Sequence, residues 1–177
     1  MTRTSKRVTS RDAASQPAED ALFFDDLVPG EQHVTAGRTV TEADVVGFAG
    51  LSGDYNRLHV DAEFAAHTPF GERVAHGLLV LSIASGLATR LRVSEALQAN
   101  ILGLLDLQCQ WPAPTRIGDT VRVVLTINEC SPTSRPDRGV VVMSREVVNQ
   151  REETVMSSGW KLLVRRRPAA DGSDAGG

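Results

Sequence analysis

The chain has 177 residues, of which 41% are hydrophobic and 23% are charged. These values are ordinary for a globular protein, and the length is enough for one domain with a sizeable core. The net charge of -3 offers no broad basic face, which argues against nucleic acid as a partner. No apolar run reaches the roughly 18 residues that span a bilayer, so we expect no membrane partner.

The two ends of the chain differ from its middle. Residues 1–20 and 168–177 have almost nothing to bury, so both are expected to be disordered tails around a single domain at 21–167. The first tail has no apolar stretch typical of a secretory signal. Cys109 and Cys130 have no paired spacing, and Cys109 fits a small buried hydrophobe. Free thiols without an export signal indicate the cytoplasm.

Short elements are expected in the first third of the domain. A strand is expected at 33–40, although Gly37 weakens its middle. Thr41 and Asp44 resemble a capping box, so a helix should begin there and end near Gly50 or Gly53. The following segments are predicted to be a loop (54–61), a short helical turn (62–66) and a second loop (67–71).

The second half predicts a buried helix followed by strands. Residues 77–91 are apolar around almost the whole helical circumference, which is typical of a helix buried on all sides. From residue 100 the apolar period changes to two, and strands are expected at 101–111, 121–128, 140–149 and 154–165. Short turns link them, so they should pair antiparallel. The predicted fold is α+β, with the sheet wrapped around the helix.

Two polar side chains in the 54–61 loop suggest chemistry. Asp54 and His59 are five residues apart, a spacing that would separate them by roughly 140° on one continuous helix. In a loop they can converge and share a water molecule, as a general acid/base pair that works near neutral pH. The alternative is that each is a turn or solvated residue.

The start of the buried helix is the second candidate. Gly77 lets a ligand approach the backbone, and the first N–H groups of a helix stabilise a developing oxyanion. An acid/base pair beside such a site suits the addition of water to a double bond conjugated to a carbonyl. Gly77 could also be an ordinary helix-start glycine, His76 a structural hydrogen-bonding residue and Ser85 a packing residue. A metal site of Asp54, His59 and His76 has no tight ligand spacing to support it, so no metal is predicted.

Three segments resemble one protein family. They are F-A-G-L-S-G-D-Y-N-R-L-H (48–59) followed by V-D-A-E-F-A, His76-Gly77 with S-I-A-S-G (82–86), and W-P-A-P-T-R-I-G-D-T-V (111–121). Together they resemble the MaoC-like dehydratases, also called (R)-specific enoyl-CoA hydratases, over roughly residues 25–165. The first motif agrees with the family pattern at six or more positions in one short run.

The resemblance implies a hotdog fold, assembled as a homodimer, and a substrate carried as a thioester on coenzyme A or an acyl carrier protein. No cofactor beyond that thioester is implied. By position, Asp54 and His59 match the family's catalytic pair, and Gly77 matches the residue whose N–H holds the thioester carbonyl. Ser85 matches a supporting serine, and Asn56 a loop-shaping asparagine.

Arg57 departs from the pattern, because the family has proline there. It is either a solvated surface arginine or a contact for a carboxylate or phosphate of the substrate. The predicted activity is hydration of a trans-2-enoyl thioester or the reverse dehydration. The alternatives are a hotdog thioesterase, which directs water at the carbonyl, and a non-catalytic protein that binds acyl thioesters.

Overall fold

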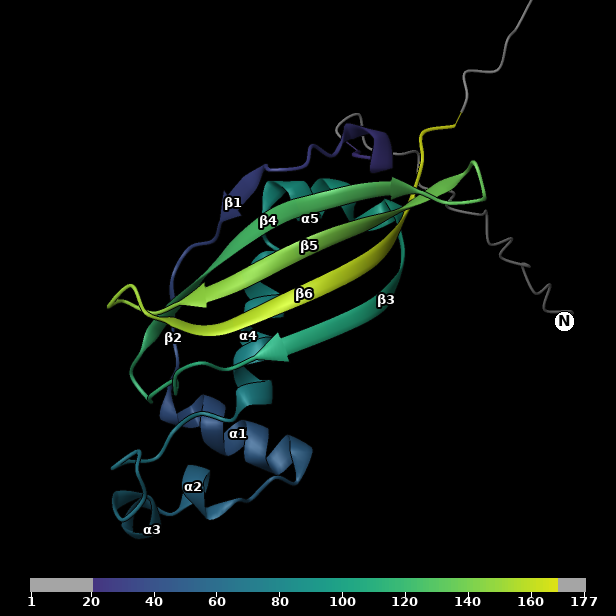
Figure 1. Cartoon of the computed structure of the whole chain (residues 1–177). Helices are drawn as coiled ribbons and strands as arrows, with labels where there is room; N and C mark the ends of the chain where they lie inside the picture. Colours follow the sequence, from purple (N-terminus) through teal and green to yellow (C-terminus); the bar gives the residue numbers. More distant parts are fainter. Residues whose placement is uncertain (1–20, 169–177) are drawn as a thin grey trace, which may run out of the picture.

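A computed structural model describes residues 21–168, so the two predicted tails lie outside the described residues, apart from Pro168. The strands form one layer (Figure 1), and helices α4 (Gly77–Ala88) and α5 (Arg92–Leu97) lie against one face of it. Helices α1 (Glu42–Ser52), α2 (Arg57–Val60) and α3 (Ala62–Ala66) gather at one end of α4. The predicted α+β architecture is confirmed.

The sheet has six antiparallel strands in the order β1-β4-β5-β6-β3, and β2 also pairs with β4. Their bounds are β1 Gln32–Val34, β2 Arg38–Thr39, β3 Ile101–Gln110, β4 Thr120–Pro132, β5 Arg138–Val148 and β6 Thr154–Arg165. Adjacent hairpins join β4 to β5 and β5 to β6, as the short turns predict. However, β3 pairs with β6 and not with its successor β4. The proline-bearing link after β3 carries the chain past β6 and β5, so that β4 lies toward the opposite edge of the sheet.

The single strand expected at 33–40 is two strands. Both β1 and β2 pair with β4, and residues 35–37 leave the ladder between them. Thr35 keeps this break attached, because its hydroxyl accepts a hydrogen bond from the Val123 N–H at 2.9 Å while its own N–H donates to the Val123 carbonyl. The interruption includes Gly37, which fits the weak strand preference of glycine.

Helix α1 begins and ends as the sequence predicts. The Thr41 hydroxyl accepts a hydrogen bond from the Asp44 N–H, and the Asp44 carboxylate accepts one from the Thr41 N–H, which makes a reciprocal capping box. Gly53 ends the helix with φ at 76°, in the left-handed region that glycine adopts without strain. The chain therefore leaves α1 in a sharp turn immediately before Asp54.

Helix α4 supplies the centre of the core but is shorter and less covered than predicted. It ends at Ala88, and α5, which the sequence did not predict, follows after a turn. One face of α4 packs on the sheet through Leu79, Val80, Ile83, Ala84, Leu87 and Ala88. Leu78, Ser82 and Gly86, one helical turn apart, are exposed, so the expectation of a helix buried on all sides is wrong for the isolated chain.

No single helix among residues 21–168 is long and apolar enough to cross a membrane. Helix α4 together with the segment Arg92–Asn100 reaches the required length and composition only as a pair bent by 79°. Cys109 and Cys130 are free and half-buried, which leaves Cys109 less covered than predicted. Burial raises the pKa of both thiols.

Asp119, at the turn into β4, anchors this end of the sheet. Its side chain is 3% exposed and accepts hydrogen bonds from the Arg116 N–H, the Gln150 amide and the Arg151 guanidinium at 2.8–2.9 Å. Burial alone would raise the pKa of this carboxyl, but the three donors outweigh burial and hold the pKa below its ordinary value of 3.8.

We therefore expect Asp119→Ala to lower the free energy of unfolding by about 2–3 kcal/mol, since three donors lose a charged acceptor and Arg151 is half exposed. Because the pKa is lowered on folding, the stabilisation by Asp119 is complete above about pH 3.8 and is lost as the pH falls through the folded-state value. Urea unfolding of both proteins across this range measures it. A gap between wild type and variant that stays constant down to strongly acidic pH would contradict the assignment.

Candidate active site

Asp54 and His59 converge because the segment between them is not one continuous helix. Asp54 lies in the turn after α1, where its carboxylate accepts a hydrogen bond from the Asn56 N–H at 3.2 Å. Asn56 in turn caps α2, since its side-chain oxygen accepts from the Leu58 N–H at 3.0 Å. The expectation of a loop throughout 54–61 is thus wrong for Arg57–Val60, but this single helical turn is what brings His59 back toward Asp54.

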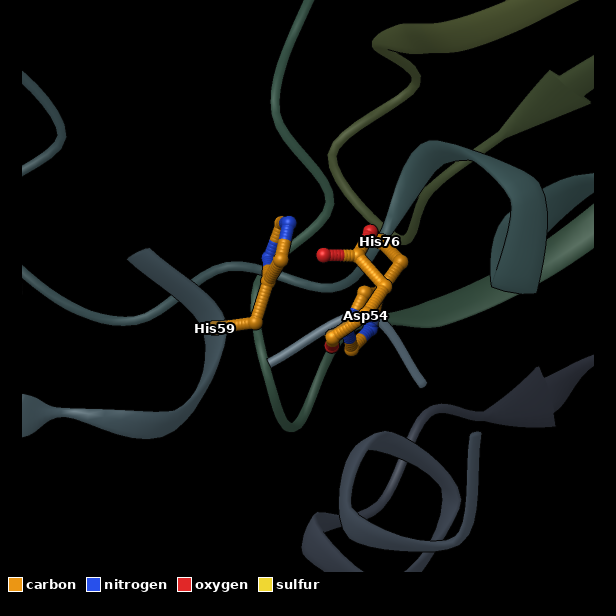
Figure 2. Close-up of side chains that lie close together, drawn as sticks. All are labelled: Asp54, His59 and His76. Carbon is orange, nitrogen blue, oxygen red and sulfur yellow. The ribbon is translucent and has the colours of Figure 1, made fainter. Parts of the chain in front are cut away.

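The orientation of His59 is set by a backbone carbonyl. Its Nδ1 lies 2.8 Å from the carbonyl oxygen of Val74, and because a carbonyl can only accept, Nδ1 carries the proton. In the neutral ring the lone pair is then on Nε2. Polar atoms of Asp54, His59 and His76 lie within 4.8 Å of one another, and Figure 2 shows the three side chains gathered in one place. His59 therefore offers a basic nitrogen beside a carboxylate.

His76 holds the backbone of Asp54 in place. Its side chain is 2% exposed, and its Nε2 donates to the Asp54 carbonyl at 3.0 Å, which fixes the backbone of the residue that bears the carboxylate. Its ring lies 3.9 Å from the His59 ring and 5.0 Å from the Phe48 ring, measured between centroids. The structural hydrogen bond considered for His76 is present, and it runs to the loop that carries Asp54.

Gly77 opens α4 directly after His76, whose ring contacts the His59 ring and the Asp54 carbonyl, so α4 begins close to the Asp54–His59 pair. The indole of Trp111, just after β3, covers Gly77: its Nε1 donates to the Gly77 carbonyl at 3.1 Å. A Cβ atom at position 77 would lie only 3.0 Å from the Trp111 ring. A side chain at residue 77 would therefore crowd the Trp111 indole.

Comparison with known proteins identifies the family. The MaoC like domain matches residues 26–149, which is well over half of the chain. The chain belongs to the MaoC-like dehydratase family. It is 37% identical over 123 residues to a 3-hydroxybutyryl-CoA dehydratase of Methylorubrum extorquens, a match that covers 69% of this chain and 74% of that protein. It is 35% identical over 144 residues to an (R)-specific enoyl-CoA hydratase of Rhodospirillum rubrum, covering 78% and 95%.

Larger relatives contain only a part that matches. Protein MaoC of Klebsiella aerogenes is 42% identical over 104 residues, a match that spans 59% of this chain but 30% of that protein.

The crystal structure of the MaoC-like dehydratase from Rhodospirillum rubrum superposes with a TM-score of 0.75, at 35% identity, and covers 84% of this chain and 99% of that one. A double-hotdog protein of Mycobacterium tuberculosis (TM-score 0.71, 17% identity, covering 89% and 52%) shares the fold. The predicted hotdog fold is confirmed.

Three contacts of this MaoC-like site were not predicted from the sequence. The Val74 carbonyl orients His59, Phe48 packs on the His76 ring, and Trp111 covers Gly77. Phe48 and Trp111 stand in the segments that resemble the family, but they carry no acid/base group and gave no chemical signal. By contrast, the Ser85 hydroxyl makes no hydrogen bond with Asp54, His59 or His76 among the described residues. It lies eight residues, or about 12 Å of helix axis, beyond Gly77.

Arg57, where the MaoC-like pattern has proline, is engaged on the surface. Its guanidinium pairs with Asp61 at 2.9 Å and lies 4.5 Å above the Phe64 ring, and 64% of its side chain is exposed. Hydrogen bonds from the Phe64 N–H and from Arg57 lower the pKa of the Asp61 carboxyl, so this pair is charged at neutral pH. These contacts favour the interpretation of Arg57 as a solvated surface arginine over a contact with substrate.

Arg57→Ala is accordingly expected to change kcat and KM for an enoyl-CoA by less than about threefold, because an exposed ion pair contributes little. Steady-state kinetics with intact and 3′-dephosphorylated coenzyme A thioesters measures it. A KM that rises tenfold for the intact substrate alone would instead assign Arg57 to a phosphate of the coenzyme.

The same three side chains could hold a divalent cation. Two imidazoles and one carboxylate with donor atoms within 4.8 Å of one another form a possible ligand set, and the buried Nδ1 of His76 has no hydrogen-bond partner in the described part of the chain. Acid/base chemistry by Asp54 and His59 needs no metal, and the absence of a resident metal stays a prediction.

Proposed function

We propose that the chain catalyses the reversible addition of water to trans-2-enoyl thioesters, giving (R)-3-hydroxyacyl thioesters. The observation that carries the proposal is the convergence of the Asp54 carboxylate and the His59 imidazole, whose Nδ1 is held by the Val74 carbonyl, close to the start of α4. Relatives at about 35% identity are named for this chemistry. The (R) configuration rests on the names of relatives, such as the (R)-specific enoyl-CoA hydratases of Rhodospirillum rubrum and Aeromonas caviae.

The mechanism follows from the three parts of the site. A water held by Asp54 and His59 gives a proton to one of them while its oxygen attacks C3 of the enoyl group. Negative charge then develops on the thioester oxygen, and the N–H of Gly77, in the first turn of α4, stabilises it. Protonation of C2 in the same site completes the addition, so that one water supplies both H and OH. Dehydration is the same path in reverse.

A direct assay separates this function from its alternatives. With crotonyl-CoA, we expect loss of the ultraviolet absorbance of the conjugated enoyl thioester, no release of free thiol, and a product that an (R)-specific 3-hydroxyacyl-CoA dehydrogenase oxidises. Free thiol, detected with a thiol reagent, would instead indicate the thioesterase. Binding of crotonyl-CoA without either reaction would indicate the non-catalytic protein.

Coenzyme A and acyl carrier protein thioesters are both candidate substrates, since relatives are named for acyl-CoA and for 3-hydroxyacyl thioesters. Comparing kcat/KM for crotonyl-CoA with that for crotonyl acyl carrier protein distinguishes the two carriers.

Two free thiols in the described part of the chain favour a reducing compartment, and we infer the cytoplasm.

We also infer that the chain forms a homodimer. Leu78, Ser82 and Gly86 form an exposed stripe on α4, and the edge strand β3 also has four exposed large apolar side chains: Ile101, Leu102, Leu104 and Leu105. An exposed apolar edge strand is a site for pairing with another chain.

A charge placed on β3 tests the dimer. Leu105→Glu is expected to convert a dimer to a monomer by light scattering coupled to size exclusion, because Leu105 is 55% exposed in the isolated chain. Leu51→Glu is the matched control, because Leu51 is an 85% exposed leucine on α1, and this change should leave the dimer intact. A wild-type protein that is monomeric at high concentration would refute the inference.

A further inference from the structure

Arg145 on β5 is a buried charge that the reaction does not use. Its side chain points to the inner face of the sheet and is only 8% exposed, and its Nε and Nη1 atoms have no hydrogen-bond partner among residues 21–168. Burial lowers the pKa of Arg145 to about 10, so the guanidinium still carries its charge near neutral pH. A buried charge without a counterion is costly, and proteins normally pair it.

The contacts that Arg145 does make fix its position but leave its charge uncompensated. The guanidinium lies 3.8 Å from the centroid of the Trp160 ring. Trp160 is held in turn, because its indole N–H donates to the Ser158 hydroxyl at 2.9 Å, and that hydroxyl donates to the Arg145 carbonyl. The ring face attracts a cation but cannot neutralise it. Arg145 is therefore held in place with hydrogen-bond donors to spare.

A cavity of about 100 Å³ lies against this guanidinium, between β5, β6 and the helices α4 and α5. Its polar lining is Arg145, Thr89, Ser94 and Gln98, and its apolar lining is Leu97, Ile101, Met143 and Leu162. This volume holds several waters or a small organic anion. Thr89 lies twelve residues after Gly77, or about 18 Å along the helix direction, so the cavity is at the opposite end of α4 from the candidate active site.

We propose that this cavity binds the carboxylate of an aliphatic acid, with Arg145 as its anchor. One guanidinium balances one negative charge, and its planar N–H groups match the two oxygens of a carboxylate, whereas a phosphate dianion would leave excess charge buried. The four apolar side chains suit a short hydrocarbon stem. The carboxylate comes either from a free short-chain acid or from the distal end of an acyl chain. The second source rests on the function proposed above.

Binding of a free acid is measured without any activity assay. Trp160 reports on the cavity in a Trp111→Phe background, which removes the only other tryptophan. At constant ionic strength, butyrate should change its fluorescence saturably and raise the melting temperature, and neutral butyramide should do neither. Arg145→Met, which keeps an apolar side chain of similar length, should weaken butyrate at least tenfold. Arg92→Met, which removes an exposed arginine from the neighbouring α5, should not.

A second variant keeps the charge of Arg145 and fills the cavity beside it. Ser94→Leu should also abolish the butyrate response while leaving Arg145 in place, which protects the test if Arg145→Met folds poorly. The proposal is overturned if butyrate does not saturate, if butyramide matches it, or if both variants bind butyrate as the wild type does.

The two sources of the carboxylate are separated by kinetics. Trans-2-enoyl-CoA substrates of graded length are compared with a terminal carboxylate and with a terminal methyl group. If the acyl chain supplies the carboxylate, Arg145→Met lowers kcat/KM at least tenfold for one or more of the carboxylate-ended substrates and leaves the methyl-ended ones unchanged. If a free acid is the ligand, Arg145→Met changes both series equally while butyrate binding is still lost. An inactive wild type would refute the proposed function but not the butyrate result.

Discussion

Asp54→Asn is expected to lower kcat for enoyl-thioester hydration by about 100-fold or more, the usual scale for the loss of a general base. The amide keeps the shape of the side chain and an oxygen that can accept the Asn56 N–H, so the turn should hold. What is lost is a group that takes a proton from water. Stopped-flow absorbance of the enoyl thioester gives kcat and KM, and we expect KM to change little.

The partner substitution tests the same pair from the imidazole side. His59→Ala should cost a similar factor, and His59→Asn should be no better, although its amide nitrogen can still donate to the Val74 carbonyl. If the two residues act as a unit on one water, the double variant should be little worse than either single one.

Matched controls come from the neighbouring turns. His67 is exposed and its Nδ1 contacts only the Glu63 carbonyl among the described residues, so His67→Ala should retain nearly full activity. Near-normal hydration by both Asp54→Asn and His59→Ala would rule out the proposed mechanism, because the mechanism assigns the proton transfers to these two side chains.

Local signals in the sequence were enough for much of the fold. The reciprocal bonds of Thr41 and Asp44 need only residues three apart, and the strands from β3 to β6 follow from a period of two. Convergence of Asp54 and His59 was also predictable, because Gly53 and Asn56 favour a loop over a continuous helix in this segment. Each of these features is decided within a few residues.

The features that were missed depend on contacts between distant residues. The pairing of β3 with β6 is set by how the chain crosses the sheet, which no short window contains. Trp111 reaches Gly77 across 34 residues, and Val74 reaches His59 across 15. The exposed stripe of α4 was mistaken for core because an apolar side chain looks the same in sequence whether it packs on the sheet or lies on the surface.

Gly77→Ala is the second substitution with a large expected effect. The new Cβ would lie 3.0 Å from the Trp111 ring, tighter than most packed Cβ contacts, so either the indole or the first turn of α4 must shift by a few tenths of an ångström. A displacement of about 1 Å at a catalytic group can cost roughly 100-fold in rate, and this smaller shift should cost less. We therefore expect kcat/KM to fall by about 10-fold.

The cause can be isolated with a double-mutant cycle. If Trp111 is the obstacle, Trp111→Ala should relieve much of the loss caused by Gly77→Ala, and the two changes should be strongly non-additive. If substrate needs the space above Gly77 directly, the penalty should be the same with or without the indole. Gly47→Ala on α1, where a Cβ meets nothing within 4 Å, is the control and should leave kcat/KM unchanged. Full activity of Gly77→Ala would contradict the crowding argument: it would mean that a Cβ at residue 77 neither displaces the indole nor obstructs the thioester, because alanine keeps the backbone N–H.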